Sequence, residues 1–450
     1  MSNKSKAGFA LAVIFAINTM NFFDRQILGA VGELIKNEWT LSDTALGTLG
    51  TAFTLIYAVV GLPLGRLADK FSRKTILAYG VFAWSALTAV SGLAQNFFQM
   101  FIMRLGVGVG EATCAPAANS MIGDLYPATR RAKALSVFML GLPIGIALSF
   151  AISGLIAKSY GWRMTFYVAG IPGVLCAIAA YMMREPARGA TEVHNIGAMQ
   201  REGSPFLLVL SIPTMWWLIA GGALHNFNMY TIGAFLTPFL MRFHALDVGN
   251  AGLVSMAVYG LAGIPGLLIG GYLGDAVMRK RKNGRLIVGA LAMLVSVPFL
   301  FLGLNASKGG VSTFMIFTII GIAAMYVYYS TVYSAIQDVV EPSLRGTAMA
   351  IYFFAMYVVG GSFGPVVTGY LSDTFTRQAI AAAGQAVTPD TIKQFAGDGL
   401  HTALYLVPIL CIGLFIVLYG ASRTVTKDMG RLEKWMAESA QLPVTASAKQ

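Results

Sequence analysis

Charged residues are scarce in this chain: Asp, Glu, Lys and Arg make up 12% of its 450 residues, whereas hydrophobic residues make up 56%. Soluble proteins carry about 25% charged residues, because their surfaces must face water. The composition therefore excludes an ordinary soluble domain and indicates a membrane protein.

Cysteines, histidines and phosphate-binding motifs are also scarce or absent. The three cysteines (Cys114, Cys176 and Cys411) fall within apolar runs, at spacings that fit neither a disulfide framework nor a zinc site. The four histidines are scattered, which excludes a metal-hydrolase cluster. No Gly-x-x-x-x-Gly-Lys-Ser/Thr segment is present, so ATP-driven pumping lacks its phosphate loop. We therefore expect no enzyme activity, no metal and no cofactor.

Long apolar stretches are abundant, and each is long enough to cross a bilayer. We place twelve of them, at about residues 8–35, 44–68, 74–95, 97–123, 133–157, 163–183, 208–241, 248–274, 285–304, 312–337, 346–371 and 401–422. The strands of a membrane barrel would be about ten residues long and alternate in polarity. The pattern therefore predicts an all-α integral membrane protein with twelve transmembrane helices.

A charged motif, Gly-x-Leu-x-Asp-x-x-x-Arg, occurs twice, 206 residues apart, each time in the short gap between two apolar runs. The first copy contains Gly65, Asp69 and Arg73, and the second contains Gly271, Asp275 and Arg279. A hydrophobic chain that repeats such a segment is built from two similar halves, as many secondary transporters are. We predict two pseudo-symmetric six-helix bundles, residues 1–183 and 208–422, with a linker over 184–207 and a tail over 423–450.

The basic residues predict the orientation of these spans. With twelve spans both termini lie on one side, and 23 of the 32 Lys and Arg residues then fall on that side. Positive charge accumulates on the cytoplasmic side of membranes. We therefore expect a multi-pass protein of the plasma (inner) membrane with cytoplasmic N- and C-termini. The net charge of +12 reflects this topology and contact with anionic lipid, not nucleic-acid binding.

Four ionisable residues lie deep within the predicted spans of the first half: Asp24, Arg25, Arg104 and Glu111. Such groups are costly in a bilayer, so they must face an internal cavity and pair with one another. Asp24 and Arg104 lie at similar depths, and Arg104 and Glu111 share one helical face. We expect Asp24 to meet Arg104. A static ion pair that only fixes helix packing is the alternative.

Protonation of either carboxylate would weaken its pairing with Arg104 and favour a different arrangement of the helices. Such a change would couple proton occupancy to the tilting of one half against the other. The second half has no matching carboxylate, because the 206-residue offset places Tyr230 opposite Asp24. We therefore assign proton coupling to the first half, with His225 as a further candidate.

The predicted spans of the second half are rich in aromatic residues that suit a ligand with an apolar tail and a polar head. The predicted substrate-cavity residues are His225, Asn226, Tyr230, Tyr326, Tyr329, Tyr333 and Tyr357. Ordinary packing is the alternative for each single aromatic ring.

These motifs resemble a known family. Twelve spans with the repeated motif look like the major facilitator superfamily, over residues 8–422. Asn21-Phe22-Phe23-Asp24-Arg25 and the segment from Arg104 through Gly-Val-Gly-Glu-Ala resemble the spinster branch, which is associated with movement of sphingolipids and lysophospholipids. The resemblance implies that Gly65, Asp69, Arg73, Gly271, Asp275 and Arg279 act as gate residues that help to hold the outward-facing state.

The expected function is therefore alternating-access transport, coupled to protons, of an amphipathic substrate of the lysophospholipid or sphingolipid type. We expect a monomer whose partners are the bilayer, protons and this small molecule. The Asn-x-x-Asp-Arg segment is shared with organic-anion:proton symporters, so a symporter of small organic anions or sugar acids is the main alternative. A receptor that binds ligand without transporting it is another.

Overall fold

The computed structural model describes residues 3–187 and 203–440, apart from some side chains within the helices, and the regular structure of these residues is entirely helical. A helix satisfies its own backbone N–H and C=O groups, which a spanning segment requires in lipid. The predicted all-α membrane architecture is confirmed. Nine helical stretches of the described residues meet the length and hydropathy of a membrane span. The count of twelve stays a prediction.

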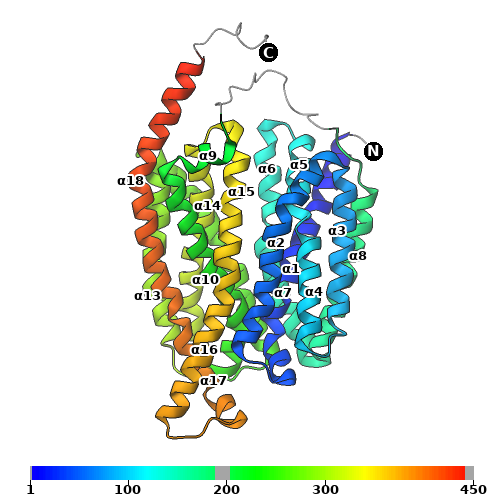
Figure 1. The fold of residues 1–450 in the computed structure, drawn as a ribbon, viewed down its shortest axis with the longest axis vertical. Helices are drawn as coiled ribbons and strands as arrows, with labels where there is room; N and C mark the ends of the chain where they lie inside the picture. The colour runs from blue at the N-terminus through cyan, green and yellow to red at the C-terminus, as the bar shows by residue number, and fades with distance from the viewer. Residues whose placement is uncertain (1–2, 188–202, 441–450) are drawn as a thin grey trace.

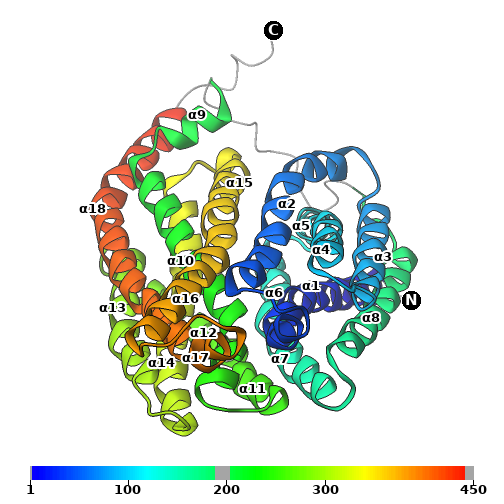
Figure 2. The same ribbon diagram turned by 60° about the horizontal axis from the view of Figure 1, so that its bottom comes forward.

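The helices of the first half gather on one side of the molecule (Figures 1 and 2). They are α1 (Asn3–Trp39), α2 (Asp43–Lys70), α3 (Arg73–Ser91), α4 (Phe97–Glu111), α5 (Cys114–Leu125), α6 (Ala128–Met139), α7 (Gly141–Tyr160) and α8 (Trp162–Met182). Polar residues start two of these helices: Ser42 accepts a hydrogen bond from the N–H of Ala45, and Asn96 from the N–H of Gln99. The predicted fourth span is divided, because α4 ends at Glu111 and α5 begins at Cys114.

The helices of the second half form the other group in Figure 2. They are α9 (Pro205–Leu210), α10 (Pro213–Phe243), α11 (Val248–Ser255), α12 (Gly263–Met278), α13 (Gly284–Leu304), α14 (Val311–Val339), α15 (Arg345–Ala355), α16 (Ser362–Ala382), α17 (Pro389–Leu404) and α18 (Leu406–Ala440). Two π-helical turns, η1 (Met256–Leu261) and η3 (Met356–Gly361), join α11 to α12 and α15 to α16, and a 3-10 turn, η2 (Pro342–Leu344), precedes α15.

The two groups converge at one end of the molecule and separate toward the other (Figure 1). We call the end where α1 begins and α18 finishes the terminal end, and the opposite end the far end. Toward the far end, α1 packs on α10, α2 on α16, and α7 on α11. The approach is close at Gly47 of α2, where a Cβ atom would collide with the main chain of Pro365 in α16. Main-chain contacts of this kind need glycine, and they hold the halves together at this end.

Candidate functional site

Arg25 and Glu111 form a buried ion pair inside the first half. Arg25 Nε lies 2.9 Å from Glu111 Oε2, and these side chains are 3% and 0% exposed. Asn21, one turn before Arg25 on α1, donates its Nδ2 to the same oxygen at 3.0 Å. Glu111 Oε1 and Arg25 Nη1 make no hydrogen bond within the described residues. The pair therefore keeps one free acceptor and one free donor.

The expected side-chain pairing of Asp24 with Arg104 does not occur in this structure. Arg104 Nη1 instead lies 3.4 Å from the main-chain oxygen of Asp24. The Asp24 carboxyl group is fully buried near Trp84 and Thr88 of α3, without a well-formed hydrogen bond to either. Neighbouring residues of a helix project about 100° apart, so Arg25 faces the centre of the molecule while Asp24 faces the interior of the first half.

A small cavity between the two halves borders Arg25, whereas its partner Glu111 is not part of the lining. Its lining includes Arg25, Gln26 and Arg104 from the first half, with Tyr230 and Pro365 from the second. Its volume of about 50 Å³ holds a few water molecules. Arg104 Nε and Nη2 make no hydrogen bond within the described residues. Two guanidinium groups with unused donors at one cavity suit an anionic group, because such donors match carboxylate and phosphate oxygens.

Aromatic rings surround Arg25 and continue into the second half. The guanidinium lies 4.2 Å from the ring centre of Tyr57 and 6.0 Å from that of Tyr357. From Tyr357 the ring contacts pass through Phe353, 6.4 Å away, to Tyr333, 5.5 Å further. Tyr329 lies 5.6 Å from Tyr333, and its own further contacts are with buried rings of the second half. We call Tyr57, Tyr357, Phe353, Tyr333 and Tyr329 the aromatic wall.

The residues predicted to line the substrate cavity divide into two groups. Tyr230 lines the central cavity, whereas Tyr329, Tyr333 and Tyr357 belong to the aromatic wall, and all four are partly exposed. His225, Asn226 and Tyr326 are instead buried in the packing of the second half, so the structure does not bring them to the cavity.

The buried group has partners of its own. The His225 ring stacks on Tyr328 with 4.0 Å between centroids. Asn226 donates to the oxygen of Met356 at 3.1 Å, and Tyr326 to the oxygen of Tyr259 at 3.0 Å. Of the three α14 tyrosines predicted to line the cavity, Tyr326 therefore faces its own bundle, whereas Tyr329 and Tyr333 belong to the aromatic wall.

The first copy of the repeated motif extends over the last turns of α2, the short connection at 71–72 and the start of α3. Arg73 is 1% exposed and forms ion pairs with Asp124 and with Glu185, the latter at 2.9 Å. Partial burial opposes the charged form of Glu185, but hydrogen bonds from Arg73, Ser72 and the main chain lower its pKa. The side-chain surroundings of Gly65 and Asp69 lie outside the described residues.

The second copy uses a residue that the motif does not contain. Gly271 and Asp275 lie within α12, and Asp275 pairs with Arg285 of α13 at 2.7 Å. Arg285 also pairs with Asp338 of α14 at 2.5 Å, so it joins three helices. Arg73 in the first half joins α3, α5 and the segment that follows α8. Arg279 is exposed, and its Nε lies 3.5 Å from the main-chain oxygen of Asp275. Among the described residues the motif arginine of the second copy therefore has no ion pair, and the sequence offset alone did not reveal Arg285.

A buried charge network at the far end links the two halves, and sequence reasoning missed it. Arg242 at the end of α10 contacts Glu33 of α1 at 2.8 Å through Nε and Asp43 of α2 at 2.7 Å through Nη1. Lys36 also pairs with Asp43 at 2.6 Å. We call Glu33, Asp43 and Arg242 the far-end clamp. The sequence did contain one indication of this network, because oppositely charged residues lie at the edges of three predicted spans.

A second residue pair reinforces the clamp. Asp373 of α16 accepts hydrogen bonds at 2.9 Å from the main-chain N–H groups of Asp43 and Thr44. One half thus supplies the cap for the first turn of a helix in the other half, where N–H groups have no partner within the helix. Ser372 adds a 2.6 Å bond to Asp43.

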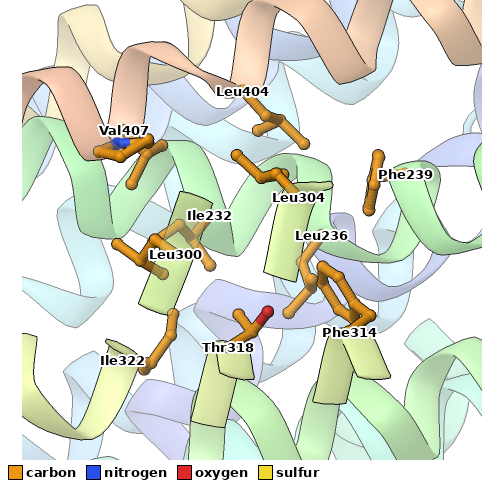
Figure 3. Close-up of a pocket in the computed structure, with 11 residues that line it drawn as sticks. Ile232, Leu236, Phe239, Leu300, Leu304, Phe314, Thr318, Ile322, Leu404 and Val407 are labelled. Carbon is orange, nitrogen blue, oxygen red and sulfur yellow. The ribbon is translucent and has the colours of Figure 1, made fainter. Parts of the chain in front are cut away.

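A separate apolar pocket of about 40 Å³ lies within the second half, between α10, α13, α14 and the α17–α18 junction (Figure 3). Its lining residues are Ile232, Leu236, Phe239, Leu300, Leu304, Phe314, Thr318, Ile322, Leu404, Val407 and Pro408. Thr318 carries the one polar side chain of this set. The pocket offers no charged group to a substrate.

Comparison with known proteins gives the family. The model of the Major Facilitator Superfamily matches residues 14–365. An MFS-type efflux pump of Mycolicibacterium smegmatis is 30% identical over 84% of this chain and 87% of its own. A probable L-galactonate transporter of Escherichia coli is 28% identical, over 81% and 83%.

A solved structure extends this likeness to three dimensions. It is described as a bacterial homolog of the human lysosomal transporter spinster in an inward-facing, unoccupied conformation. It matches with a TM-score of 0.85 at 26% identity, over 95% of this chain and 99% of its own. The chain therefore belongs to the major facilitator superfamily, a family of transporters and not of enzymes, and within it resembles the spinster proteins.

Proposed function

We propose that this transporter couples protons to the movement of an amphipathic substrate with an anionic head, of the lysophospholipid type. One observation carries the proposal: Arg25 lines a cavity between the halves while Glu111, buried behind it, forms an ion pair with the same guanidinium. Each partner of this pair keeps an atom without a hydrogen bond in the described part of the chain. The aromatic wall begins at the same guanidinium, so a charged head and an apolar body find adjoining surfaces.

Exchange of partners at Arg25 provides the coupling. While Glu111 is ionised, it occupies Arg25 and competes with an anionic head for the guanidinium. Protonation of Glu111 removes that competition and frees Arg25 for the substrate. Proton occupancy and substrate occupancy thus bias the same residue, which is the differential interaction that a coupled conformational change requires. Asn21 donates to the Glu111 oxygen that contacts Arg25, and we propose that this bond persists when Glu111 is protonated.

Asp24 has a separate place in this scheme. Its carboxyl group is enclosed in the first half, with Arg104 on the main-chain side. A buried carboxylate without a cation is costly in its ionised form. We propose that Asp24 is a second proton site, which Arg104 reaches when the first half rearranges.

The proposed orientation puts the terminal end in the cytoplasm of a plasma-membrane protein, as the distribution of basic residues predicts. The clamped far end then faces outward, and the conformation is inward-facing. We propose residues 1–183 and 208–422 as the moving halves, 184–207 as the linker and 423–450 as the tail of a monomer.

A second candidate function is symport of small organic anions such as sugar acids. It is favoured by the similarity to the L-galactonate transporter and by the small size of the central cavity. The two functions differ in their need for the aromatic wall. A sugar acid needs the guanidinium and polar partners, whereas an acyl chain needs apolar rings along its length.

Flux into proteoliposomes under an imposed pH gradient tests the proposal. A labelled lysophosphatidylglycerol and a labelled hexonate are compared in the same vesicles, with Tyr333→Ser as a wall variant and Arg25→Gln as a head-site variant. We expect lysolipid movement that both variants abolish. Hexonate flux that survives Tyr333→Ser, without lysolipid movement, would establish the alternative.

A further inference from the structure

A cluster of unneutralised cations lies at the terminal end of the second half. Arg279, Lys280 and Arg281 follow one another in the turn between α12 and α13, and all three are exposed. No ion pair of these residues exists within the described part of the chain, because the nearby acids have other partners. Arg285 forms ion pairs with Asp275 and Asp338, as described above. The neighbouring Lys282 forms an ion pair with Glu433 of α18 at 2.6 Å.

Helices α12 and α18 both present, in order toward the terminal end, an exposed aliphatic residue, an exposed tyrosine and an exposed arginine. On α12, Leu268 and Tyr272 are 68% and 73% exposed, and Arg279 lies seven residues beyond Tyr272 on the same helical face. Exposed aliphatic residues of a membrane helix face the hydrocarbon, and exposed tyrosines mark the headgroup level. At 1.5 Å per residue, Arg279 lies about 10 Å beyond Tyr272, toward the water.

On α18, Ile416 is 58% exposed, Tyr419 45% exposed, and Arg423 follows one turn later. Arg423 Nη2 donates to the Tyr419 hydroxyl at 3.0 Å, which fixes this cation at the same level. Asn283 of the turn donates to the main-chain oxygen of Ser422 at 3.1 Å and so joins the two segments. The shared succession places Arg279, Lys280, Arg281 and Arg423 at one edge of the membrane. We call these four residues the basic edge.

We propose that the basic edge binds the headgroup of an anionic diacyl phospholipid from the surrounding leaflet. The phosphate oxygens accept hydrogen bonds from the guanidinium groups, while the acyl chains lie along the exposed aliphatic faces of α12 and α18. The first half differs, because its motif arginine, Arg73, is buried and paired with two carboxylates. This lipid is a resident of the site and not the transported substrate, so the inference does not depend on the proposed substrate or on proton coupling.

The test compares lipid binding by the purified full-length protein and by a variant with Arg279, Lys280 and Arg281 all changed to Gln. The control variant changes Lys308, Arg377 and Lys393 to Gln, which removes the same charge at the far end. Native mass spectrometry measures the bound dioleoyl-phosphatidylglycerol relative to dioleoyl-phosphatidylcholine, and thermal unfolding is followed in each lipid. Inorganic phosphate replaces the lipid in a third arm.

Each basic residue near an anionic lipid surface contributes roughly fivefold in affinity, so loss of three lowers the phosphatidylglycerol preference on the order of a hundredfold. The control variant should keep the preference, and unfolding in phosphatidylcholine should match the unmodified protein, which excludes misfolding. An unchanged preference in the Arg279/Lys280/Arg281 variant would overturn the proposal. Equal stabilisation by inorganic phosphate would also overturn it, because the site would then not require a lipid.

Discussion

The far-end clamp gives the most specific prediction about conformation. Arg242 is 7% exposed and contacts two carboxylates of the opposite half, so Arg242→Gln breaks the clamp without touching the central cavity. Loss of one partner of a buried ion pair costs about 3–5 kcal/mol. Lys36 still neutralises Asp43 after the change, which favours the lower value. A cost of about 3 kcal/mol corresponds to a shift of roughly a hundredfold in a two-state equilibrium.

The clamp is made only while the far ends of the halves are together, so this cost falls on the far-end-closed state. We expect the ratio of far-end-open to far-end-closed molecules to rise on the order of a hundredfold in Arg242→Gln. Arg242→Lys keeps the charge but loses the two-pronged contact, and should give a smaller rise of about tenfold. Terminal-end opening should decrease in parallel, because the halves move as units.

Electron–electron distance measurements between spin labels at Gln95 and Gln385 report this equilibrium, because both residues are exposed at the far end and belong to different halves. Lys308→Gln is the matched control: it removes a far-end cation whose partner, Asp398, lies in the same half. If Arg242→Gln and Lys308→Gln gave the same distance distribution as the unmodified protein, the clamp would not set the conformation.

Three further predictions concern the motifs and the proton site. Glu111→Gln should abolish uphill transport in a pH gradient while substrate exchange without net proton movement survives; counterflow assays separate the two activities. Arg285→Ala should slow transport at least tenfold, because it releases two carboxylates from one cation, whereas Arg279→Ala should change the rate less than twofold; equal rates for the two variants would contradict the assignment. The third concerns stability against pH: the pKa of Glu185 is lowered in the folded state, so its contact with Arg73 stabilises above the unfolded pKa of about 4.3 and is lost as pH falls through the lowered value. Thermal unfolding between pH 7 and 3 should therefore show a smaller acid-induced loss of stability in Glu185→Gln than in the unmodified protein.

The all-α membrane architecture followed from composition and hydropathy, because a bilayer imposes the length and the apolar character of each span. The orientation inferred from the basic residues stays a prediction. The buried residues Arg25, Arg104 and Glu111 were found by the same reasoning, since ionisable groups inside apolar runs are rare. The way in which these residues pair was not predicted correctly. Depth along a helix is readable from residue number, but the direction of a side chain depends on how each helix is rotated in the bundle. That rotation turns Arg25, and not Asp24, toward the cavity.

The predicted gate residues show a second limit of prediction from the sequence. Repeating a motif predicts that two segments are related, but not that each position keeps its partner. In the second half Arg285, six residues beyond the motif arginine, pairs with two carboxylates, as Arg73 does in the first half, but the partners differ. Arg242 was missed for a related reason: its partners, Glu33 and Asp43, lie about 200 residues away in the sequence.

Proton movement driven by substrate tests the central claim most directly. Proteoliposomes hold a pH-sensitive dye, and a lysophosphatidylglycerol gradient is imposed with no initial pH difference. We predict that the unmodified protein acidifies or alkalinises the lumen as substrate moves, that Glu111→Gln moves substrate without any pH change, and that Arg25→Gln moves neither. Substrate-driven proton flux that persists in Glu111→Gln would contradict the account, because the coupling proton would then bind elsewhere.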